Sequence, residues 1–186
     1  MRKLTVFNAV SLDGYFTDAK GDMSWAHKDD AEWQAFAAEN ARGGGVLVFG
    51  RITYEMMAAF WPTPAAFESN AAVAERMNNL PKVVFSTTLE KSSWNNTTLV
   101  KGDIAAEMRR LKHESGPDMV IMGSGTIVAQ LAQARLIDGY QIVVNPIILG
   151  SGRTMFDGVE EHQSLQLTNT RAFSNGNTVL WYETEG

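Results

Sequence analysis

The chain lacks cysteine altogether, and this absence excludes disulfides, a thiolate nucleophile and any metal site built on cysteine ligands. Its three histidines, His27, His113 and His162, are widely separated and do not have the spacing of a metal site. The G-x-S-x-G pattern of α/β-hydrolases is also missing, although Ser124 stands between two glycines. We therefore expect neither a metal centre nor a catalytic nucleophile.

Concentrated positive charge and long apolar runs are missing as well. Lys and Arg number 16 against 21 Asp and Glu, and no stretch concentrates positive charge, so a nucleic-acid partner is not expected. The apolar run at the N-terminus is short and gives way to Asn8, which predicts neither a signal peptide nor a membrane span. We expect a cytoplasmic protein that has no membrane partner.

What is present fits one globular domain. At 186 residues, of which 45% are hydrophobic, the chain can bury a substantial core, and we expect residues 1–186 to form a single domain. Short apolar, β-branched runs alternate with stretches of helical spacing, which is typical of an α/β protein. The alternating segments Leu165–Thr168 and Thr178–Tyr182 flank turn residues 174–177 and predict a C-terminal antiparallel hairpin.

The remaining elements follow from apolar runs, helix caps and breaks at glycine or proline. Strands are predicted at Leu4–Val10, Val46–Phe49, Val83–Phe85, Thr97–Val100, Met119–Met122 and Tyr140–Val144. Helices are predicted from about Asp29 to Ala41, from Arg51 to Ala59, from Glu68 to Asn79, from the cap Asp103 to Glu114, and from Thr126 to Ala134. Together these segments predict a mixed, mainly parallel sheet with helices on both faces.

Two segments share one design, in which a buried strand is followed by a glycine and then by a helix start. The strands Val46–Phe49 and Met119–Met122 lead in this way into Gly50 and into Gly123–Thr126. A helix N-terminus favours a phosphate, and glycine lets the backbone approach it closely. Since ligands gather at the carboxyl ends of parallel strands, the two turns could together hold a dinucleotide. Each glycine alone could equally serve a tight turn, and the G-x-G-x-x-G fingerprint is absent because Val128 takes the third glycine position.

Six short motifs occur in a fixed order along the chain. They are Ser11–Gly14, Gly50–Glu55, Ser86–Thr87, Gly123–Thr126, Leu136–Asp138 and Pro146–Gly152, with Phe156 shortly after the last. In these motifs the chain resembles the dihydrofolate reductase fold family, particularly its branch with the reductase domain of bacterial riboflavin biosynthesis. The resemblance implies a three-layer α/β fold whose eight-stranded mixed sheet is mostly parallel.

The resemblance also implies NADPH as the hydride donor. The residues that it assigns to the cofactor phosphates are Gly50, Arg51 and Thr53 at the first helix start, with Gly123, Ser124, Gly125 and Thr126 around the pyrophosphate at the second. It places Ser86 and Thr87 near the adenosine ribose and its 2′-phosphate. The planar guanidinium of Arg51 suits a phosphate, although an ion pair with Glu55 is its alternative role.

Two acids and two tryptophans are candidates for the substrate side. Trp25 and Asp30 have the spacing at which dihydrofolate reductases place a tryptophan and a substrate-binding acid that assists protonation, but Asp30 is equally a candidate helix cap. Asp13, in a motif that resembles the riboflavin branch, is a second candidate acid or a turn residue before Gly14. Trp33 belongs to the core or lines the substrate cleft.

Two functions remain open from the sequence. The first is an NADPH-dependent reductase of a small pterin-like or pyrimidine-like heterocycle, and the second is a non-catalytic nucleotide-binding protein that retains the fold. Ser24 stands where dihydrofolate reductases usually have proline, which favours a substrate other than dihydrofolate. Relatives often form homodimers, and the apolar residues 147–149 with the C-terminal hairpin could supply an interface, or could instead belong to the core.

Overall fold

The computed structural model describes residues 1–26, 30–43 and 45–185, which form an eight-stranded sheet, a two-stranded ribbon and flanking helices. The strands of the large sheet are β1 (Leu4–Ser11), β3 (Val46–Gly50), β4 (Lys82–Phe85), β5 (Thr97–Val100), β6 (Met119–Ile121), β7 (Gly139–Asn145), β9 (Leu165–Ala172) and β10 (Thr178–Thr184). The helices are α1 (Ala31–Arg42), α2 (Arg51–Phe60), α3 (Pro64–Asn79), α4 (Ile104–His113), α5 (Gly125–Gln133) and the short 3-10 helix η1 (Ser24–Ala26). The ribbon pairs β2 (Thr17–Asp18) with β8 (Gly152–Arg153).

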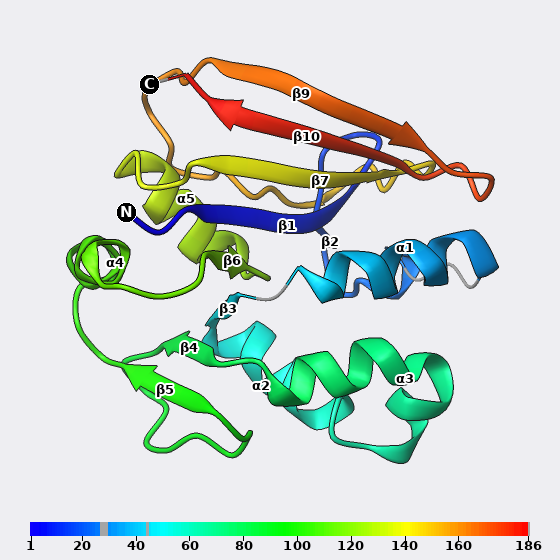
Figure 1. Ribbon diagram of the computed structural model, residues 1–186. Helices are drawn as coiled ribbons and strands as arrows, with labels where there is room; N and C mark the ends of the chain where they lie inside the picture. The colour runs from blue at the N-terminus through cyan, green and yellow to red at the C-terminus, as the bar shows by residue number, and fades with distance from the viewer. Residues whose placement is uncertain (27–29, 44, 186) are drawn as a thin grey trace.

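The large sheet has the strand order β5-β4-β3-β6-β1-β7-β10-β9. The first six strands in this order are parallel, whereas β10 runs antiparallel to both β7 and β9 (Figure 1). The predicted mixed, mainly parallel sheet of eight strands is therefore confirmed, together with the C-terminal hairpin. In this order β3 and β6 are neighbours, so the two glycine-led helix starts leave the sheet from adjacent strands.

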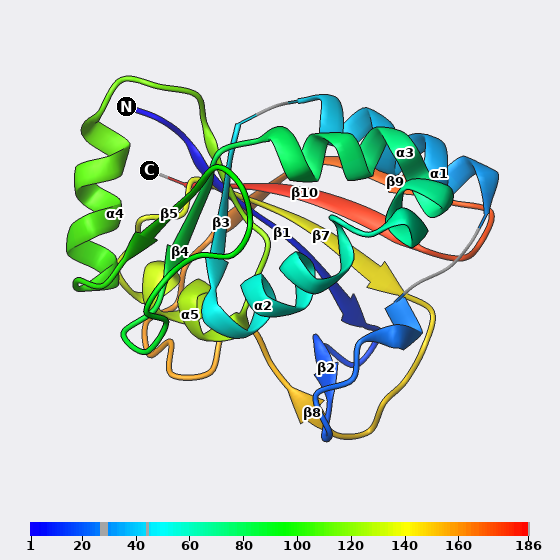
Figure 2. The same cartoon turned by 90° about the horizontal axis from the view of Figure 1, so that it is seen from below.

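Helices cover both faces of the sheet, as the sequence predicts. Side chains alternate along β3, so Val46 and Val48 pack in the cluster with α4 and α5, while Leu47 and Phe49 pack with α2 and α3. Phe36 of α1 packs on the second face over β7 and β10. Seen from below, α1 and α3 lie side by side, with α4 and α5 on the other side of the molecule (Figure 2). β3 is buried at every position, which explains its continuously apolar sequence.

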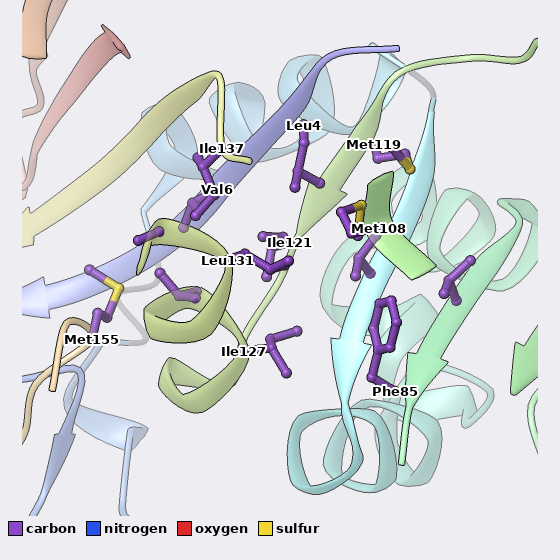
Figure 3. Packing of buried hydrophobic residues seen from close by; sticks show 14 of the residues in the cluster. Leu4, Val6, Phe85, Met108, Met119, Ile121, Ile127, Leu131, Ile137 and Met155 are labelled. Carbon is purple, nitrogen blue, oxygen red and sulfur yellow. The ribbon is translucent and has the colours of Figure 1, made fainter. Parts of the chain in front are cut away.

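The largest cluster of buried residues lies between the sheet and the helices α4 and α5. Figure 3 shows Ile127 and Leu131 of α5 beside Leu4 and Ile121 of the central strands, and Met108 of α4 close to β3. Each of these five side chains is at most 3% exposed. Full burial of such a side chain is worth about 1.5–3 kcal/mol, so this interface holds α5, and with it the second helix start, firmly on the sheet.

Asp138 ties three elements together at the start of β7. Its Oδ2 accepts a hydrogen bond of 2.6 Å from the backbone N–H of Leu4 and forms an ion pair with Lys112 of α4. The ammonium group of Lys112 also donates to the carbonyl of Leu136 at 2.8 Å. The motif Leu136–Asp138 therefore has a structural role, because it fixes β1 and β7 in register and anchors α4.

Helix α3 differs from its prediction, which placed its start at Glu68. It begins at Pro64, since proline in the first helical turn has no N–H to leave unpaired and has a helical φ. The helix is also broken at Asn70, whose φ of −157° and ψ of 93° are those of an extended residue. The Asn70 side chain then accepts from the backbone N–H of Val73 at 3.2 Å and so caps the second half of the helix.

Helix α1 begins at Ala31, and the predicted start at Asp29 lies outside the described residues. Asp30 is its N-cap, with Oδ1 accepting from the backbone N–H of Trp33 at 3.0 Å. Asp103 caps α4 in the same way, as the sequence predicts, through the backbone N–H of Ala106 at 2.7 Å. None of the helices within the described ranges is long and apolar enough to cross a bilayer.

Two features at the periphery were not predicted. Every residue of β9, the edge strand, is exposed, because no helix or further strand covers it. The ribbon of β2 and β8 lies beyond the carboxyl end of β1 and joins the loop after β1 to the loop after β7 (Figure 2). In that second loop Ile148 is 71% exposed, so the alternative that residues 147–149 all belong to the core is wrong.

Candidate active site

The two glycine-led strand exits meet at the carboxyl ends of β3 and β6. The backbone N–H of Gly50 donates to the carbonyl of Gly123 at 2.9 Å. A Cβ at Gly50 would lie 2.9 Å from Oγ of Ser124, and one at Gly123 would lie 3.1 Å from Oγ1 of Thr53. Gly123 also has a φ of +114°, in a region that favours glycine. Position 123 therefore requires glycine, whereas a Cβ at Gly50 would have to displace the Ser124 hydroxyl from between the two helix starts.

The helix starts at these exits differ from those of α1 and α4. Gly50 and Ser124 are the N-caps of α2 and α5, and neither supplies a side-chain cap to its helix. The backbone N–H groups of both first turns therefore have no side-chain partner from the cap residue, and they carry the positive end of the helix dipole. Two such ends on adjacent strands form a surface suited to an anion.

A cavity of about 710 Å³, which we call the strand-exit cavity, opens in front of these helix starts. Residues at the beginning of α2 and α5 that line it are Ile52, Thr53, Met56, Ser124, Gly125 and Thr126. Its other walls come from the β2–β8 ribbon, the start of α4 and the far end of α5. The volume lies within the range of about 300–1,000 Å³ that is typical of ligand sites.

The structure thus brings together Thr53 and residues 124–126 of the predicted cofactor set, with Gly50 and Gly123 directly behind them. Arg51 lies outside the lining, and its guanidinium pairs with Glu55 at 2.8 Å on the outer face of α2, which was its alternative role. Ser86 accepts from the backbone N–H of Leu89 at 2.9 Å within its own turn. Neither Ser86 nor Thr87 lines the cavity.

Sequence reasoning missed Arg153, which lies in β8 and lines the strand-exit cavity. Its guanidinium makes no hydrogen bond or ion pair with another described residue, so its charge is available to a ligand. The nearest signal in the sequence was its place directly after Gly152, the last glycine of the motif Pro146–Gly152. The sequence did not show that Arg153 would face the cavity, because only the pairing of β8 with β2 turns this loop toward it.

A second cavity, of about 660 Å³, lies among α1, α2 and α3, and we call it the helix cavity. Its lining is mostly apolar and consists of Trp33, Gln34, Ala37, Met56, Met57, Phe60, Trp61, Ser69, Asn70 and Val73. Met56 lines both cavities. Ile52, Met56 and Phe60 follow one another at four-residue spacing on the exposed face of α2, so this face forms one wall that runs along both cavities.

Asp30 lies one helical turn before Trp33 and Gln34, two residues that line the helix cavity. Its Oδ1 caps α1, whereas its Oδ2 is buried and has no hydrogen-bond partner among the described residues. A buried carboxylate oxygen without a partner is unfavourable unless a ligand satisfies it. The structure therefore gives Asp30 the cap role predicted as one alternative. Asp30 itself lines neither cavity, and its second oxygen lies buried behind the cavity residues Trp33 and Gln34.

The comparison with known proteins identifies the family. The family model of the RibD C-terminal domain matches residues 2–179. This chain belongs to that family. The uncharacterized protein YyaP of Bacillus subtilis (strain 168) is 24% identical over 186 residues, covering 100% of this chain and 96% of YyaP.

Solved structures confirm the fold of this RibD C-terminal domain. A putative riboflavin biosynthesis protein from Shewanella sp. PV-4 superposes with a TM-score of 0.75 and 24% identity over 99% of each chain. Dihydrofolate reductase from Enterococcus faecalis, complexed with NADP(H) and RAB-propyl, superposes with a TM-score of 0.64 and 14% identity, covering 99% of this chain and 97% of that one. The resemblance read from the six motifs is therefore confirmed for family and fold, and the fold is of a reductase type.

Two motifs of this RibD C-terminal domain are joined by Asp13. Its carboxylate accepts from the backbone N–H of Leu149 at 3.1 Å and from that of Gly150 at 2.7 Å. A hydrogen bond with the Ser11 side chain, together with these backbone bonds, holds the pKa of Asp13 below its usual value. The exposed, ionised Asp13 thus braces the loop after β7 and lines neither cavity.

The two candidate tryptophans of this family member are placed differently. Trp33 lines the helix cavity and packs against Phe36 and Phe173, with ring centroids 5.2 and 5.1 Å away. Trp25 lies in η1, donates from its indole N–H to the carbonyl of Asp22 at 3.1 Å, and lines neither cavity. In the described parts of the chain no three His, Asp or Glu side chains gather in a way that could hold a metal ion.

Proposed function

We propose that this protein is an NADPH-dependent reductase of a small heterocyclic compound. The observation that carries the proposal is the meeting of two helix starts, both without side-chain caps, at one cavity that shares Met56 with an apolar cavity. The diphosphate of the nucleotide requires an anion-binding surface. Its flat nicotinamide ring and the flat ring of the substrate beside it require an apolar pocket.

The residues present fit NADPH at the strand-exit cavity. Thr53, Ser124 and Thr126 offer hydroxyl groups, and the first turns of α2 and α5 offer backbone N–H groups to the diphosphate. Gly125 allows the ring of Phe16 to pack directly on the start of α5, because a Cβ there would lie 2.6 Å from that ring. Arg153 of β8 supplies a positive charge to the same lining, which also contains Asp103 and Asp157. Arg51, Ser86 and Thr87 lie outside this lining, so we assign the cofactor to the other residues.

When bound, NADPH supplies a hydride to an electrophilic carbon of the substrate. The helix cavity holds the substrate ring against the wall that Met56 shares with the cofactor side, and its apolar lining keeps water away. Asp30 is the proposed substrate acid. It lines neither cavity, but it lies one helical turn before Trp33 and Gln34 of the helix cavity, and its buried Oδ2 has no partner among the described residues, so we propose that a substrate ring reaching past these two residues donates an N–H to this oxygen. Asp13 is proposed as a loop brace only.

The decisive experiment adds a negative charge at the start of α5. Thr126 is exposed, and glutamate in a first helical turn is favourable, so Thr126→Glu should fold as well as the wild type. It should nevertheless raise the Kd for NADPH, read from nicotinamide fluorescence, by about tenfold or more through repulsion of the diphosphate. Thr168→Glu makes the same change on the exposed strand β9 and should leave the Kd unchanged.

Turnover measurements test whether the protein reduces a substrate as well as binding NADPH. NADPH oxidation is followed with dihydropterins, dihydrofolate and ribosylaminopyrimidines, and Asp30→Asn should lower kcat by about a hundredfold with the substrate that is turned over. Binding of NADPH without oxidation across the panel would instead support a non-catalytic nucleotide-binding protein. No NADPH binding at millimolar concentration, or equal affinity in wild type and Thr126→Glu, would refute the cofactor site.

A further inference from the structure

None of the described residues that line the helix cavity is charged, in contrast to the strand-exit cavity. Among the described residues that line it, three are aromatic, two are methionines, two are small aliphatic residues and three are uncharged polar residues. The lining of the strand-exit cavity includes Arg153, Asp103 and Asp157. The two cavities share one wall but differ sharply in the electrostatic environment that they offer to a ligand.

The polar side chains of the helix cavity are largely used within the protein. Asn70 donates from Nδ2 to Oε1 of Gln34 at 2.6 Å and to its backbone carbonyl at 3.3 Å, and its Oδ1 caps the helix at Val73. The indole N–H of Trp61 points to the sulfur of Met57 at 3.0 Å. Little hydrogen-bonding capacity is left for a ligand, so recognition in this cavity rests on apolar and aromatic contact.

The aromatic wall of the helix cavity is held in place before any ligand arrives. Trp33 is packed between Phe36 and Phe173, and the break of α3 at Asn70 is fixed to α1 through Gln34. A rigid, flat aromatic surface favours a flat ligand, because less freedom is lost when the two surfaces stack. A phosphate or carboxylate in this cavity would lose its hydration without gaining a cation, which is strongly unfavourable.

We propose that the helix cavity selects uncharged, largely apolar aromatic or heteroaromatic substrates and rejects those that place a phosphate or carboxylate there. The inference rests on the proposed function, since it assigns the helix cavity to the substrate and the strand-exit cavity to the anionic nucleotide. Selectivity arises from the absence of a cation and from the aromatic wall together.

The test uses two fluorescent probes that differ in one anionic group, N-phenyl-1-naphthylamine and 8-anilino-1-naphthalenesulfonate. The neutral amine should bind at least about tenfold more tightly than the sulfonate, a difference set by burying an unpaired charge. Phe60→Ala should weaken binding of the neutral probe about tenfold by removing an aromatic wall. Phe67→Ala is a matched control, because both phenylalanines are 43% exposed but only Phe60 lines the cavity.

A second variant, Ser69→Lys, should shift the preference of the cavity toward the sulfonate probe. Ser69 is exposed and lines the cavity, so Ser69→Lys should fold normally and should tighten sulfonate binding about tenfold while leaving the neutral probe unaffected. Equal affinity of the wild type for the two probes, or equal effects of Phe60→Ala and Phe67→Ala, would overturn the inference. NADPH binding is measured in the same samples, so that loss of the proposed function is seen separately from failure of probe selection.

Discussion

Lys82, at the start of β4, allows the cost of burying a charge to be measured against the bonds that the charge makes. The residue is 1% exposed, and its ammonium group donates to the carbonyls of Asn78, Leu80 and Asn95 at 3.1, 2.8 and 3.2 Å. It also lies 4.4 Å from the centroid of the Trp94 ring. Among the described residues no carboxylate pairs with it, and burial lowers its pKa to about 8.

The direction of the pH effect follows from the two states. The unfolded chain keeps a lysine pKa of 10.5, so between about pH 8 and 10.5 it binds more protons than the folded chain, and stability rises with pH. A pKa difference of about 2.5 between the two states adds about 3 kcal/mol to the free energy of unfolding once the pH has risen past both pKa values. This value already includes the hydrogen bonds that the ammonium group makes in the folded state, because the folded pKa reports the balance of burial and bonding. The expected gain is therefore about 3 kcal/mol.

The assay is urea unfolding of the wild type and Lys82→Met at a series of pH values from neutral to 10.5. The free energy of unfolding of the wild type minus that of the variant should grow by about 3 kcal/mol across the series, since all other groups titrate alike in both proteins. Lys20→Met, which removes an exposed lysine, should show a constant difference. A constant difference for Lys82→Met as well would show that the three carbonyls fully compensate burial and would refute the reasoning.

Three further predictions concern the strand exits and the loop and helix around them. Gly50→Ala puts a Cβ 2.9 Å from Oγ of Ser124 and should raise the Kd for NADPH about tenfold in a fluorescence titration. Because the pKa of Asp13 is lowered, the stabilising hydrogen bonds of its carboxylate to the loop after β7 are present above pH 3.8 and are lost as the pH falls further. Asp13→Asn should weaken the same bonds at neutral pH, which should be seen as faster limited proteolysis of that loop with unchanged turnover. Lys112→Met leaves Asp138 without its cation and should lower the free energy of unfolding in urea by about 2 kcal/mol.

Much of the sheet could be read from the sequence because its determinants are local. The continuously apolar residues of β3 required burial on both faces, and Asp103 had the position of a helix cap. The two strand exits were found through Gly50 and Gly123, where the structure leaves no room for a side chain. Family and fold followed from the order of short motifs rather than from any one of them.

The rest depended on contacts between segments that are distant in the sequence. The break of α3 at Asn70 needs the side chain of Gln34, 36 residues earlier, and periodicity alone could not show it. Arg153 reaches the strand-exit cavity only through the pairing of β8 with β2. Conversely, the sequence left Arg51 with two roles, a phosphate ligand or an ion pair with Glu55, and the structure shows the ion pair on the outer face of α2.

The exposed edge strand β9 has a consequence for how the molecule opens. Its main chain pairs with β10 alone and none of its eight residues is buried, so its amides should be the first of the sheet to exchange with solvent deuterium, except near Arg171, which pairs with Glu32 of α1 at 3.5 Å. β10, β7 and β1 stand between it and the strand exits. Fraying of this edge strand should therefore leave the strand-exit cavity undisturbed, whereas Phe173, which directly follows β9, packs against Trp33 of the helix cavity.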